Sequence, residues 1–458
     1  MENEKLYIKN KYLKIYTTKV GYVGDEGVVF DKTIFFPGGG GQPEDKGFVL
    51  LLKNNYQIPT SVLDSVKEKY NNIDIYEDKD FYNFLDAISG LLSCDSYEIS
   101  KINSFYEYED LIFHKLDKIE EMDIREGDSV ILFLNWNNRR RNMQRHSGEH
   151  IVSGLFWKYY KAANKGFHMG DHYVTIDLKS QEFPVITWDM VKKIEYLANK
   201  TIWDNVDIAT DIFENKAEAS IRDVRKDINI DDGEISVVTI GNTLSPIDCV
   251  ACCGTHPNKT GEIGIIKIFK LEKNKDMWRL YLDCGYDAYE DYRQKHNIVT
   301  KLCEEYSADR DSLEEALRKK KEQIEEERDN LFNLKKKLQR IYVNEIINAI
   351  QTKDDSVWCD IFSYDDVDAS DLIEIGNNVA GVLRQDNYKN EALVLITEKD
   401  SVAMLWSLDE KINAGGIVKA MVLDGLGKGG GNVKFARLSY NKDVDDIIKT
   451  FQGLLKNL

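Results

Sequence analysis

The chain has 458 residues, of which 42% are hydrophobic and 31% charged, and its formal net charge is −18. This length exceeds one ordinary hydrophobic core and predicts roughly two to four domains. No apolar run approaches the roughly 18 residues that span a bilayer, and the start of the chain is too polar for a signal peptide, so we expect a cytoplasmic protein. The seven cysteines are odd in number and mostly dispersed, which favours reduced thiols and metal ligation over a disulfide framework.

In the N-terminal part, residues 1–135, residues 5–50 alternate in the manner of β-strands and strands resume at 112–135, which predicts a small antiparallel sheet or barrel. Four consecutive glycines, Gly38–Gly41, interrupt this pattern and let the backbone approach a ligand closely. Thr33 and Gln42 bracket the glycines with side chains that can hydrogen-bond a substrate. Residues 52–104 are acidic, aromatic and partly helical, which indicates an inserted subdomain whose purpose the pattern leaves open.

A basic run stands before a segment whose pattern predicts a helix from about Asn142 to Tyr160. The run consists of Arg139, Arg140 and Arg141. In an acidic chain such a local cluster can still meet nucleic-acid phosphates, because binding uses a surface patch rather than the average charge. The alternative interpretation is a solvated start of the helix.

Two pairs of metal-ligating side chains follow at matching spacings. His146 and His150 are four residues apart inside the predicted helix, which places both imidazoles on one face. Cys252 and His256 are also four apart, on a short glycine-containing segment. Zinc takes nitrogen and sulfur ligands in tetrahedral geometry, so these four residues form a coherent zinc site. Either motif alone is often found without a metal, but three of the seven histidines fall in these two frames.

Four protein ligands close a tetrahedral site, whereas a catalytic zinc keeps one position open. We expect three tight ligands and one displaceable ligand, and the sequence leaves open which one that is. Around this set, Asp248 is expected to hydrogen-bond a ligating histidine, and Arg279 to meet a phosphate or a buried carboxylate. Glu149 is expected to point to another face of the helix and not to act as a general base. A third pair at the same spacing, His168 and His172, stands among glycines and is expected in a surface loop.

The remaining pattern completes an α+β chain. Helical and antiparallel-strand patterns intermix over residues 136–300, which predicts an α+β domain around the ligand pairs. Residues 305–350 show heptad-like apolar spacing among dense charges, which indicates a long helical or coiled-coil arm. Residues 351–458 alternate strands with helices, which predicts a compact α/β domain. Its glycine-rich loop, Gly425–Asn432, is not a P-loop because no Ser or Thr follows the lysine.

These motifs together resemble a known family. The motifs His146–Ile151 and Asp248–His256, with the upstream glycine segment Asp31–Gly47, are similar to the editing domain of alanyl-tRNA synthetases and to the free-standing alanyl-tRNA editing proteins. The glycine-rich tail resembles the C-terminal domain that alanyl-tRNA synthetases share with DHH-type phosphoesterases. Two features depart from the family: Cys253 stands where a second glycine is usual, and the segment after Phe48 has no counterpart that we identify.

The resemblance implies a hydrolase that removes a wrong amino acid from alanine tRNA, with serine the expected error and glycine the second. Such editing is needed because a pocket for alanine rejects an added hydroxyl only about a hundred-fold. Implied with it are Zn²⁺ as cofactor, Thr33 as the hydroxyl that senses serine, Gln42 as the group that orients the acceptor end or water, and a homodimer through residues 305–458. The residues expected to contact substrate or tRNA are Gly39, Gly40, Gly41, Arg139, Arg140, Arg141, Lys428, Gly429 and Gly430.

Nothing N-terminal to the glycine segment resembles an amino-acid activation domain, so we expect a free-standing, ATP-independent enzyme. Two rival functions remain open. One is a deacylase for threonine tRNA charged with serine, since threonyl-tRNA synthetases have a similar His/Cys module. The other is a non-catalytic, zinc-stabilised module that binds tRNA. A phosphoesterase, suggested by the tail alone, lacks the Asp-His-His metal cluster that its chemistry needs.

Overall fold

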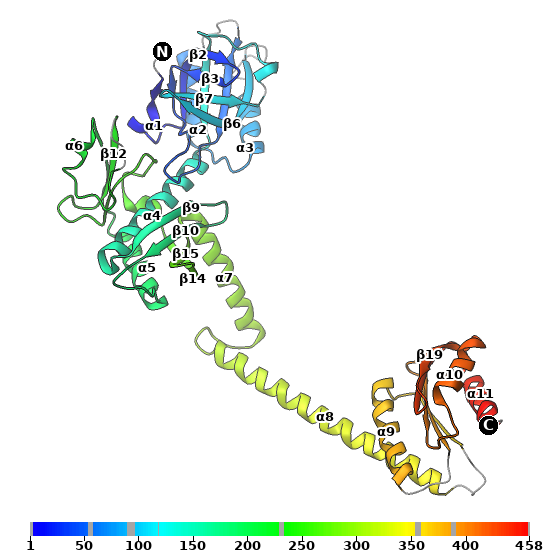
Figure 1. Cartoon of the computed structure of the whole chain (residues 1–458). Helices are drawn as coiled ribbons and strands as arrows, with labels where there is room; N and C mark the ends of the chain where they lie inside the picture. The colour runs from blue at the N-terminus through cyan, green and yellow to red at the C-terminus, as the bar shows by residue number, and fades with distance from the viewer. Residues whose placement is uncertain are drawn as a thin grey trace. The chain divides into compact units, whose positions relative to one another are not determined.

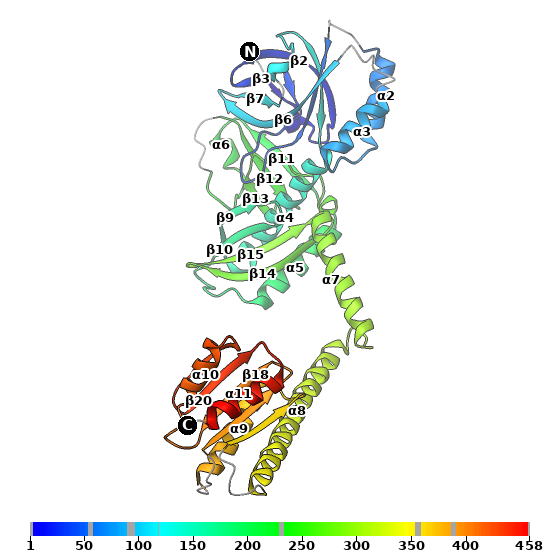
Figure 2. The same cartoon turned by 90° about the vertical axis from the view of Figure 1, so that its right-hand side faces the viewer.

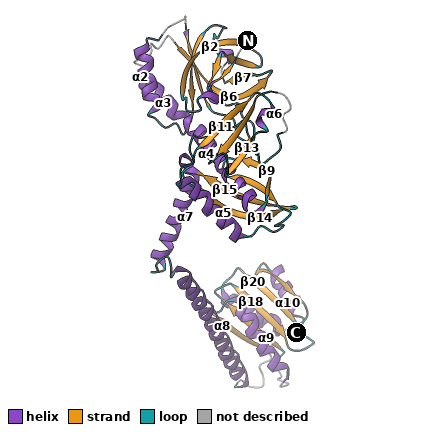
Figure 3. Ribbon diagram, turned by 90° about the vertical axis from the view of Figure 1, so that its left-hand side faces the viewer, coloured by secondary structure: helices purple, strands orange, loops and turns teal. Residues whose placement is uncertain are grey.

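The computed structural model describes residues 3–53, 58–88, 97–117, 119–228, 233–352, 359–385 and 391–456. The chain forms two compact units, Met1–Thr300 and Lys301–Leu458. Helices and strands are mixed in both units, which confirms the predicted α+β class (Figures 1 and 3). Among the described residues, no helix combines the length and the apolarity needed to cross a membrane.

The first unit begins with a closed six-stranded barrel of order β2-β3-β7-β6-β5-β8, as predicted. Side chains alternate between the two faces of each strand. On β5, Val49 and Leu51 therefore fill the barrel interior, whereas Phe48 and Leu50 face outward. The elements of this region are β1 (Glu4–Lys5), α1 (Leu6–Lys9), β2 (Ile15–Gly24), β3 (Gly27–Phe30), β4 (Lys32–Thr33), β5 (Gly47–Leu52), β6 (Tyr97–Tyr108), β7 (Leu111–Leu116), the 3₁₀ helix Ile119–Glu121 and β8 (Ser129–Leu134).

The predicted insertion, 52–104, is shorter than expected, because its end from Tyr97 onward belongs to barrel strand β6. Its helical part is a pair of helices that covers the outward face of the barrel strands β5 and β8 (Figure 2). Phe48 of β5 stacks on Phe81 of the pair, with ring centroids 3.8 Å apart. The insertion therefore buries apolar barrel side chains that water would otherwise meet. Two parts of the predicted insertion, residues 54–57 and 89–96, lie outside the described residues. The pair consists of α2 (Thr60–Asn71) and α3 (Asp78–Ile88).

The rest of the first unit is built around two antiparallel sheets, of order β14-β15-β10-β9 and β11-β12-β13. Helices α4 and α5 pack on the four-stranded sheet, with Ile151, Phe156 and Ile194 among the buried core residues. The elements are α4 (Trp136–Tyr160), β9 (Ala163–Met169), β10 (Val174–Lys179), α5 (Trp188–Trp203), β11 (Ile208–Phe213), α6 (Lys216–Ala219), β12 (Ile235–Ile240), β13 (Asp248–Ala251), the 3₁₀ helix Thr260–Ile263, β14 (Ile266–Asn274), β15 (Met277–Cys284) and α7 (Gly285–Glu305).

Helix α4 begins well before the expected start at Asn142. Asn135 caps it, because the Asn135 side chain accepts a hydrogen bond from the Asn138 backbone N–H at 3.1 Å. Asparagine is among the strongest N-cap residues. The basic run therefore lies within the first turns of the helix rather than ahead of it.

Two buried ion pairs fix α4 between the barrel and the four-stranded sheet. Arg139 pairs with Asp45 of the glycine segment, and neither side chain is exposed to solvent. Arg145 pairs with Asp283 at the end of β15, through contacts of 2.6 and 2.7 Å. Breaking a buried pair by removing one partner costs about 3–5 kcal/mol. Both pairs therefore constrain the position of α4.

The second unit has a five-stranded sheet of order β16-β17-β18-β20-β19, in which only β16 and β17 pair in parallel. The end of α8 packs on α9 through Ile346 and Ile350. The elements are α8 (Leu313–Gln351), β16 (Cys359–Tyr364), α9 (Ala369–Gln385), β17 (Ala392–Thr397), β18 (Val402–Ser407), α10 (Ala414–Leu423), β19 (Gly427–Gly431), β20 (Phe435–Tyr440) and α11 (Val444–Lys456).

The glycine-rich tail segment was expected as a loop, and it is the edge strand β19. A Cβ atom on Gly427, Gly429 or Gly431 would lie 2.1–2.2 Å from a carbonyl oxygen of the neighbouring β20. Glycine is depleted in strands, so the sequence pattern favours a loop here. The close pairing with β20 explains why glycines occupy a strand. Within it, Lys428, Gly429 and Gly430 are exposed.

Candidate metal centre

The two predicted ligand pairs meet at one point of the first unit. One ligand atom from each of His146, His150, Cys252 and His256 lies within 4.8 Å of the others. Helix α4 supplies the first two, one turn apart, and the segment after β13 supplies the last two. The Cys252 Sγ lies 3.4 Å from the His146 Nε2. The three histidines are buried, and the cysteine is partly buried.

Two of the histidines are held through Nδ1, which leaves their Nε2 atoms to face the cluster. The His146 Nδ1 lies 2.9 Å from the Gln42 Oε1, and the His256 Nδ1 lies 2.9 Å from the Ser147 hydroxyl. Such contacts orient a ligating imidazole. Within the described residues, the buried His256 Nε2 has no hydrogen-bond partner. A metal ion at the cluster would satisfy this nitrogen, so the residues fit a metal.

The third histidine is held by the predicted carboxylate. The Asp248 Oδ2 lies 3.1 Å from the His150 Nδ1, and Arg225 donates to the same carboxylate at 2.5 and 3.0 Å. Burial lowers the pKa of His150, but Asp248 and the neighbouring Cys252 outweigh burial and raise it to about 10. Metal binding at His150 therefore displaces a proton. Arg225 was missed by the sequence prediction because no spacing pattern links it to Asp248.

The electrostatics of the other ligands favour metal binding. Burial raises the pKa of the Cys252 thiol, but the three neighbouring histidines lower it well below its usual range. Burial and the neighbouring His146 lower the pKa of His256 to about 3, so this imidazole is neutral. A thiolate and neutral imidazoles are the ligand forms that zinc takes. The donor set of three nitrogens and one sulfur therefore suits Zn²⁺.

Glycines allow the chain segments around the cluster to approach closely. A Cβ on Gly254 would lie 2.3 Å from the His146 ring. A Cβ on Gly40 would lie 3.0 Å from the Cys253 Sγ, and one on Gly41 would lie 2.3 Å from Phe167. The glycine segment therefore lies against the turn that supplies Cys252. Cys253, which departs from the family pattern, is exposed and lies against this segment.

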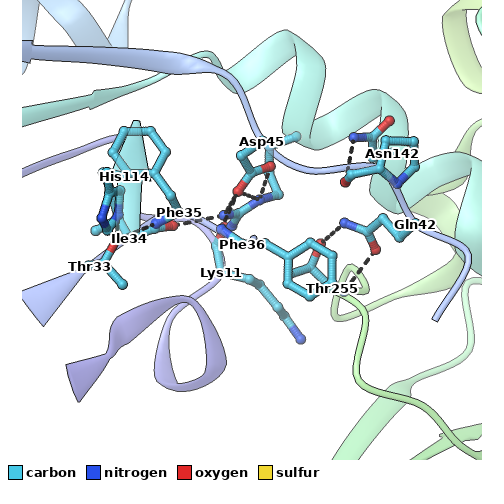
Figure 4. A network of polar contacts seen from close by, with 12 residues as sticks. Lys11, Thr33, Ile34, Phe35, Phe36, Gln42, Asp45, His114, Asn142 and Thr255 are labelled. Carbon is cyan, nitrogen blue, oxygen red and sulfur yellow. Dashed lines mark hydrogen bonds and ion pairs between the residues drawn. The ribbon is translucent and has the colours of Figure 1, made fainter. Parts of the chain in front are cut away.

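Gln42 is at the cluster, but its side chain is not free to orient water or an acceptor end. Its Oε1 accepts from the Thr255 backbone N–H at 2.9 Å and lies beside His146, while its Nε2 donates to the Thr255 hydroxyl at 2.8 Å (Figure 4). The side chain is buried. Gln42 therefore joins the glycine segment to the ligand turn and positions His146.

Thr33 lies elsewhere, at the opposite end of the network in Figure 4. It is fully buried on β4, and its hydroxyl lies 2.8 Å from the His114 Nε2 and accepts from the Phe35 backbone N–H at 3.2 Å. These contacts argue against the predicted serine-sensing role, because the hydroxyl is enclosed and already bonded. The parallel pairing of β4 with β1 fixes the strand in this position.

The basic run does not form one exposed patch, contrary to the prediction. Arg139 is fully buried; besides Asp45, it binds the backbone oxygen of Ile34 at 2.8 Å. Arg141 is bonded to Asp287. Arg140 alone is exposed and has no ion pair among the described residues. The three arginines therefore have different environments, because successive residues of an α-helix point to different faces.

Arg279 is also away from the ligand contacts. It faces Asp177 across the β10–β15 pair and donates to that carboxylate at 2.7 Å through two nitrogens. Of its two predicted partners, the structure therefore shows the buried carboxylate. The predicted loop pair is also corrected in part: His168 lies on strand β9, and both it and His172 are exposed outside the ligand cluster.

Glu149 reaches the cluster, against expectation. Its Oε1 accepts hydrogen bonds from Ser153 at 2.5 Å and from Asn164 at 2.6 Å, and its Oε2 lies 3.9 Å from the His150 Nε2. The carboxylate is buried. Glu149 and His150 are neighbours in sequence and so leave the helix in different directions. The long glutamate side chain nevertheless brings its carboxylate beside the ligands.

The comparisons with known proteins agree with this geometry. Residues 235–281, which include Cys252 and His256, match the family described as threonyl and alanyl tRNA synthetase second additional domain. The alanyl-tRNA editing protein AlaX-L of Pyrococcus horikoshii is 29% identical over 290 residues, covering 62% of this chain and 59% of that protein. The alanine–tRNA ligase of Sulfurisphaera tokodaii is 24% identical over 474 residues, covering 99% of this chain and 44% of the ligase.

The chain therefore spans less than two thirds of the length of these relatives. A further alanine–tRNA ligase, from Staphylothermus marinus, is 30% identical over 291 residues and covers 60% of this chain and 25% of the ligase. Together these matches support the resemblance of the chain to the alanyl-tRNA editing family.

Proposed function

We propose that the chain is a zinc-dependent hydrolase that removes serine, and secondarily glycine, from mischarged alanine tRNA. The observation that supports this most directly is the convergence of four ligand atoms within 4.8 Å, from the two motifs that define the resemblance. The names of the relatives, an alanyl-tRNA editing protein and alanine–tRNA ligases, favour alanine tRNA. We expect the reaction in the cytoplasm, where charged tRNA is used.

The reaction is attack of water on an aminoacyl ester, which is already an activated bond. Zinc held by His146, His150, Cys252 and His256 would polarise the ester carbonyl and lower the pKa of a bound water toward about 7. Catalysis in this way requires one ligand to be displaceable, since four ligands close the tetrahedron. If none is displaced, the metal fixes the fold and the substrate position instead.

The side chains behind the ligands have distinct tasks in this scheme. Gln42, Ser147 and Asp248 hold the three imidazoles so that their Nε2 atoms converge. Glu149 is the carboxylate beside the cluster, held at Oε1 by two donors, and its Oε2 can accept the proton of the attacking water. A proton acceptor at this place assists attack typically by about 10²–10⁴-fold.

We also propose a homodimer through α8 and the C-terminal unit. Leu317, Ile324, Leu331 and Leu338 are exposed on α8 at a seven-residue spacing. This spacing is typical of a coiled-coil seam. Pairing with a second copy would cover the seam.

A second candidate is hydrolysis of serine from threonine tRNA, because the matching family model names both threonyl and alanyl synthetases. The test is release of serine, glycine and alanine from alanine tRNA, and of serine from threonine tRNA, with zinc measured on the same sample. We expect fastest release of serine from alanine tRNA. Faster release from threonine tRNA would contradict the proposal.

A cysteine variant links this activity to the metal. We expect Cys252→Ala to lose most zinc and activity, while Cys303→Ala on α7, outside the cluster, keeps both. Full zinc content in Cys252→Ala would count against the ligand set, and hydrolysis that is equal in both variants would count against a catalytic site here.

A further inference from the structure

A pocket lies at the start of α4, apart from the metal cluster. Its volume is about 350 Å³, within the range of roughly 300–1,000 Å³ that is usual for ligand pockets. Four segments line it: Lys46 before β5, the first turns of α4, the start of α7, and the turn between α2 and α3. The inserted helical pair therefore contributes to a pocket as well as covering the barrel.

The cations of this pocket are available to an anion. Lys46 and Arg140 both line it, are exposed, and have no ion pair among the described residues. The third cation, Arg141, is bonded to Asp287, so those two charges offset each other. Asp74 also lines the pocket and reduces its net charge to about one positive unit. In a chain of net charge −18, a pocket with two unpaired cations is a distinctive feature.

The other lining groups suit a nucleotide. Tyr76 and Tyr286 line the pocket and are 67% and 60% exposed, so their rings can stack on a base. Asn137 and Asn138 also line it, and their buried Nδ2 and Oδ1 atoms have no hydrogen-bond partner within the described residues. Unpartnered buried amide atoms beside a pocket are satisfied when a polar ligand enters it.

The pocket is distinct from the place where the ester is hydrolysed. An α-helix has 3.6 residues per turn, so Arg140 and Gln144 lie on one face of α4 and His146 and His150 on another. A ligand in the pocket is therefore a part of the substrate other than its esterified end.

We propose that this pocket binds one phosphate-bearing nucleotide of the tRNA, with Lys46 and Arg140 on the phosphate and Tyr76 or Tyr286 stacked on the base. The identity of the RNA rests on the proposed function. The inserted helical pair supplies Tyr76 and thereby adds a contact to RNA at a distance from the metal.

The test measures the dissociation constant for unacylated alanine tRNA as a function of salt, for the full chain and three variants. Arg140→Gln should weaken binding and reduce the slope of log affinity against log salt by about one. Tyr76→Ala should weaken binding about 5- to 150-fold, the effect of losing one stacked base. The matched control is Arg125→Gln, since Arg125 is an exposed arginine paired with Asp123 away from the pocket, and it should change neither quantity.

Zinc content and thermal stability of each variant are measured on the same samples, so that a folding defect is recognised. Unchanged affinity and salt slope in both Arg140→Gln and Tyr76→Ala would overturn the proposal, as would absence of tRNA binding by the unmodified chain. Adenosine monophosphate is the second probe. If it binds with the same dependence on Arg140 and Tyr76 while tRNA binding is unaffected, the ligand is a free nucleotide and the assignment to RNA is overturned.

Release of serine by the unmodified chain is measured separately. If the variants lose tRNA affinity as expected but the unmodified chain releases no amino acid, the proposed hydrolase is contradicted and the pocket stands. If serine is released and the variants bind as the unmodified chain does, the pocket alone fails.

Discussion

Replacing Asp248 by asparagine should lower the zinc affinity of the site while leaving the shape of the side chain almost unchanged. The Asp248 side chain is fully buried between the His150 Nδ1 at 3.1 Å and the guanidinium of Arg225 at 2.5 and 3.0 Å. Asparagine keeps the volume but removes the charge, so the hold on His150 weakens and a buried arginine is left unpaired. Loss of such a partner typically lowers metal affinity about 10–100-fold.

The same substitution should also destabilise the first unit. Removing one partner of a buried ion pair costs about 3–5 kcal/mol, which for a unit of this size lowers Tm by roughly 5–15 °C. The double variant Asp248→Asn with Arg225→Met separates the two effects, because it removes the unpaired charge. We expect its Tm to recover in part, while its zinc affinity stays as low as in the single variant.

The assay is zinc competition with a chelating dye, together with thermal unfolding of the metal-free and zinc-loaded chain. Zinc affinity in Asp248→Asn equal to that of the unmodified chain would contradict this prediction, because Asp248 would then have no part in orienting His150. Recovery of zinc affinity in the double variant would contradict the prediction as well, because the loss in the single variant would then come from the unpaired Arg225.

The remaining predictions concern Glu149, the pairing of His150, and the exposed apolar seam of α8. Glu149→Gln should lower kcat for serine release about 10²–10⁴-fold at unchanged zinc content, and an unchanged kcat would remove Glu149 from the proton transfer. The pKa of His150 is raised to about 10, so in the metal-free chain its pairing with Asp248 contributes stability that is fully present below about pH 6.5 and lost as the pH rises toward about 10. The free energy of unfolding, measured across this pH range, should show the loss in the unmodified chain and not in Asp248→Asn. Replacing Ile324 and Leu331 by lysine should give a monomer by light scattering, whereas Phe332→Lys, one position off the seam, should not; a dimer that survives the first change would place the interface elsewhere.

The ligand set could be predicted from sequence because its spacing has a simple geometric meaning. Histidines four apart on a helix share a face, and Cys252 and His256 lie close together on a short segment of chain. The contacts behind the ligands follow no such rule. Gln42 and His146 are 104 positions apart, and only the fold brings the glycine segment onto the ligand turn.

The errors have equally specific causes. Thr33 stands beside glycines and was expected to face substrate, but the short pairing of β4 with β1 holds it inside, against His114. Arg139 was grouped with its neighbours as a charge run. Because the helix begins at the Asn135 cap, its period places Arg139 on the same buried face as His146. The buried charge of Arg139 is then compensated by Asp45.

X-ray absorption spectroscopy at the zinc edge is the most direct test of one zinc ion shared by these four ligands. We expect about one zinc per chain, bound by nitrogen at about 2.0–2.1 Å and by a single sulfur at about 2.3 Å, with the sulfur signal absent in Cys252→Ala. A zinc without sulfur, or a sulfur signal that persists in that variant, would show that His146, His150, Cys252 and His256 do not share one ion.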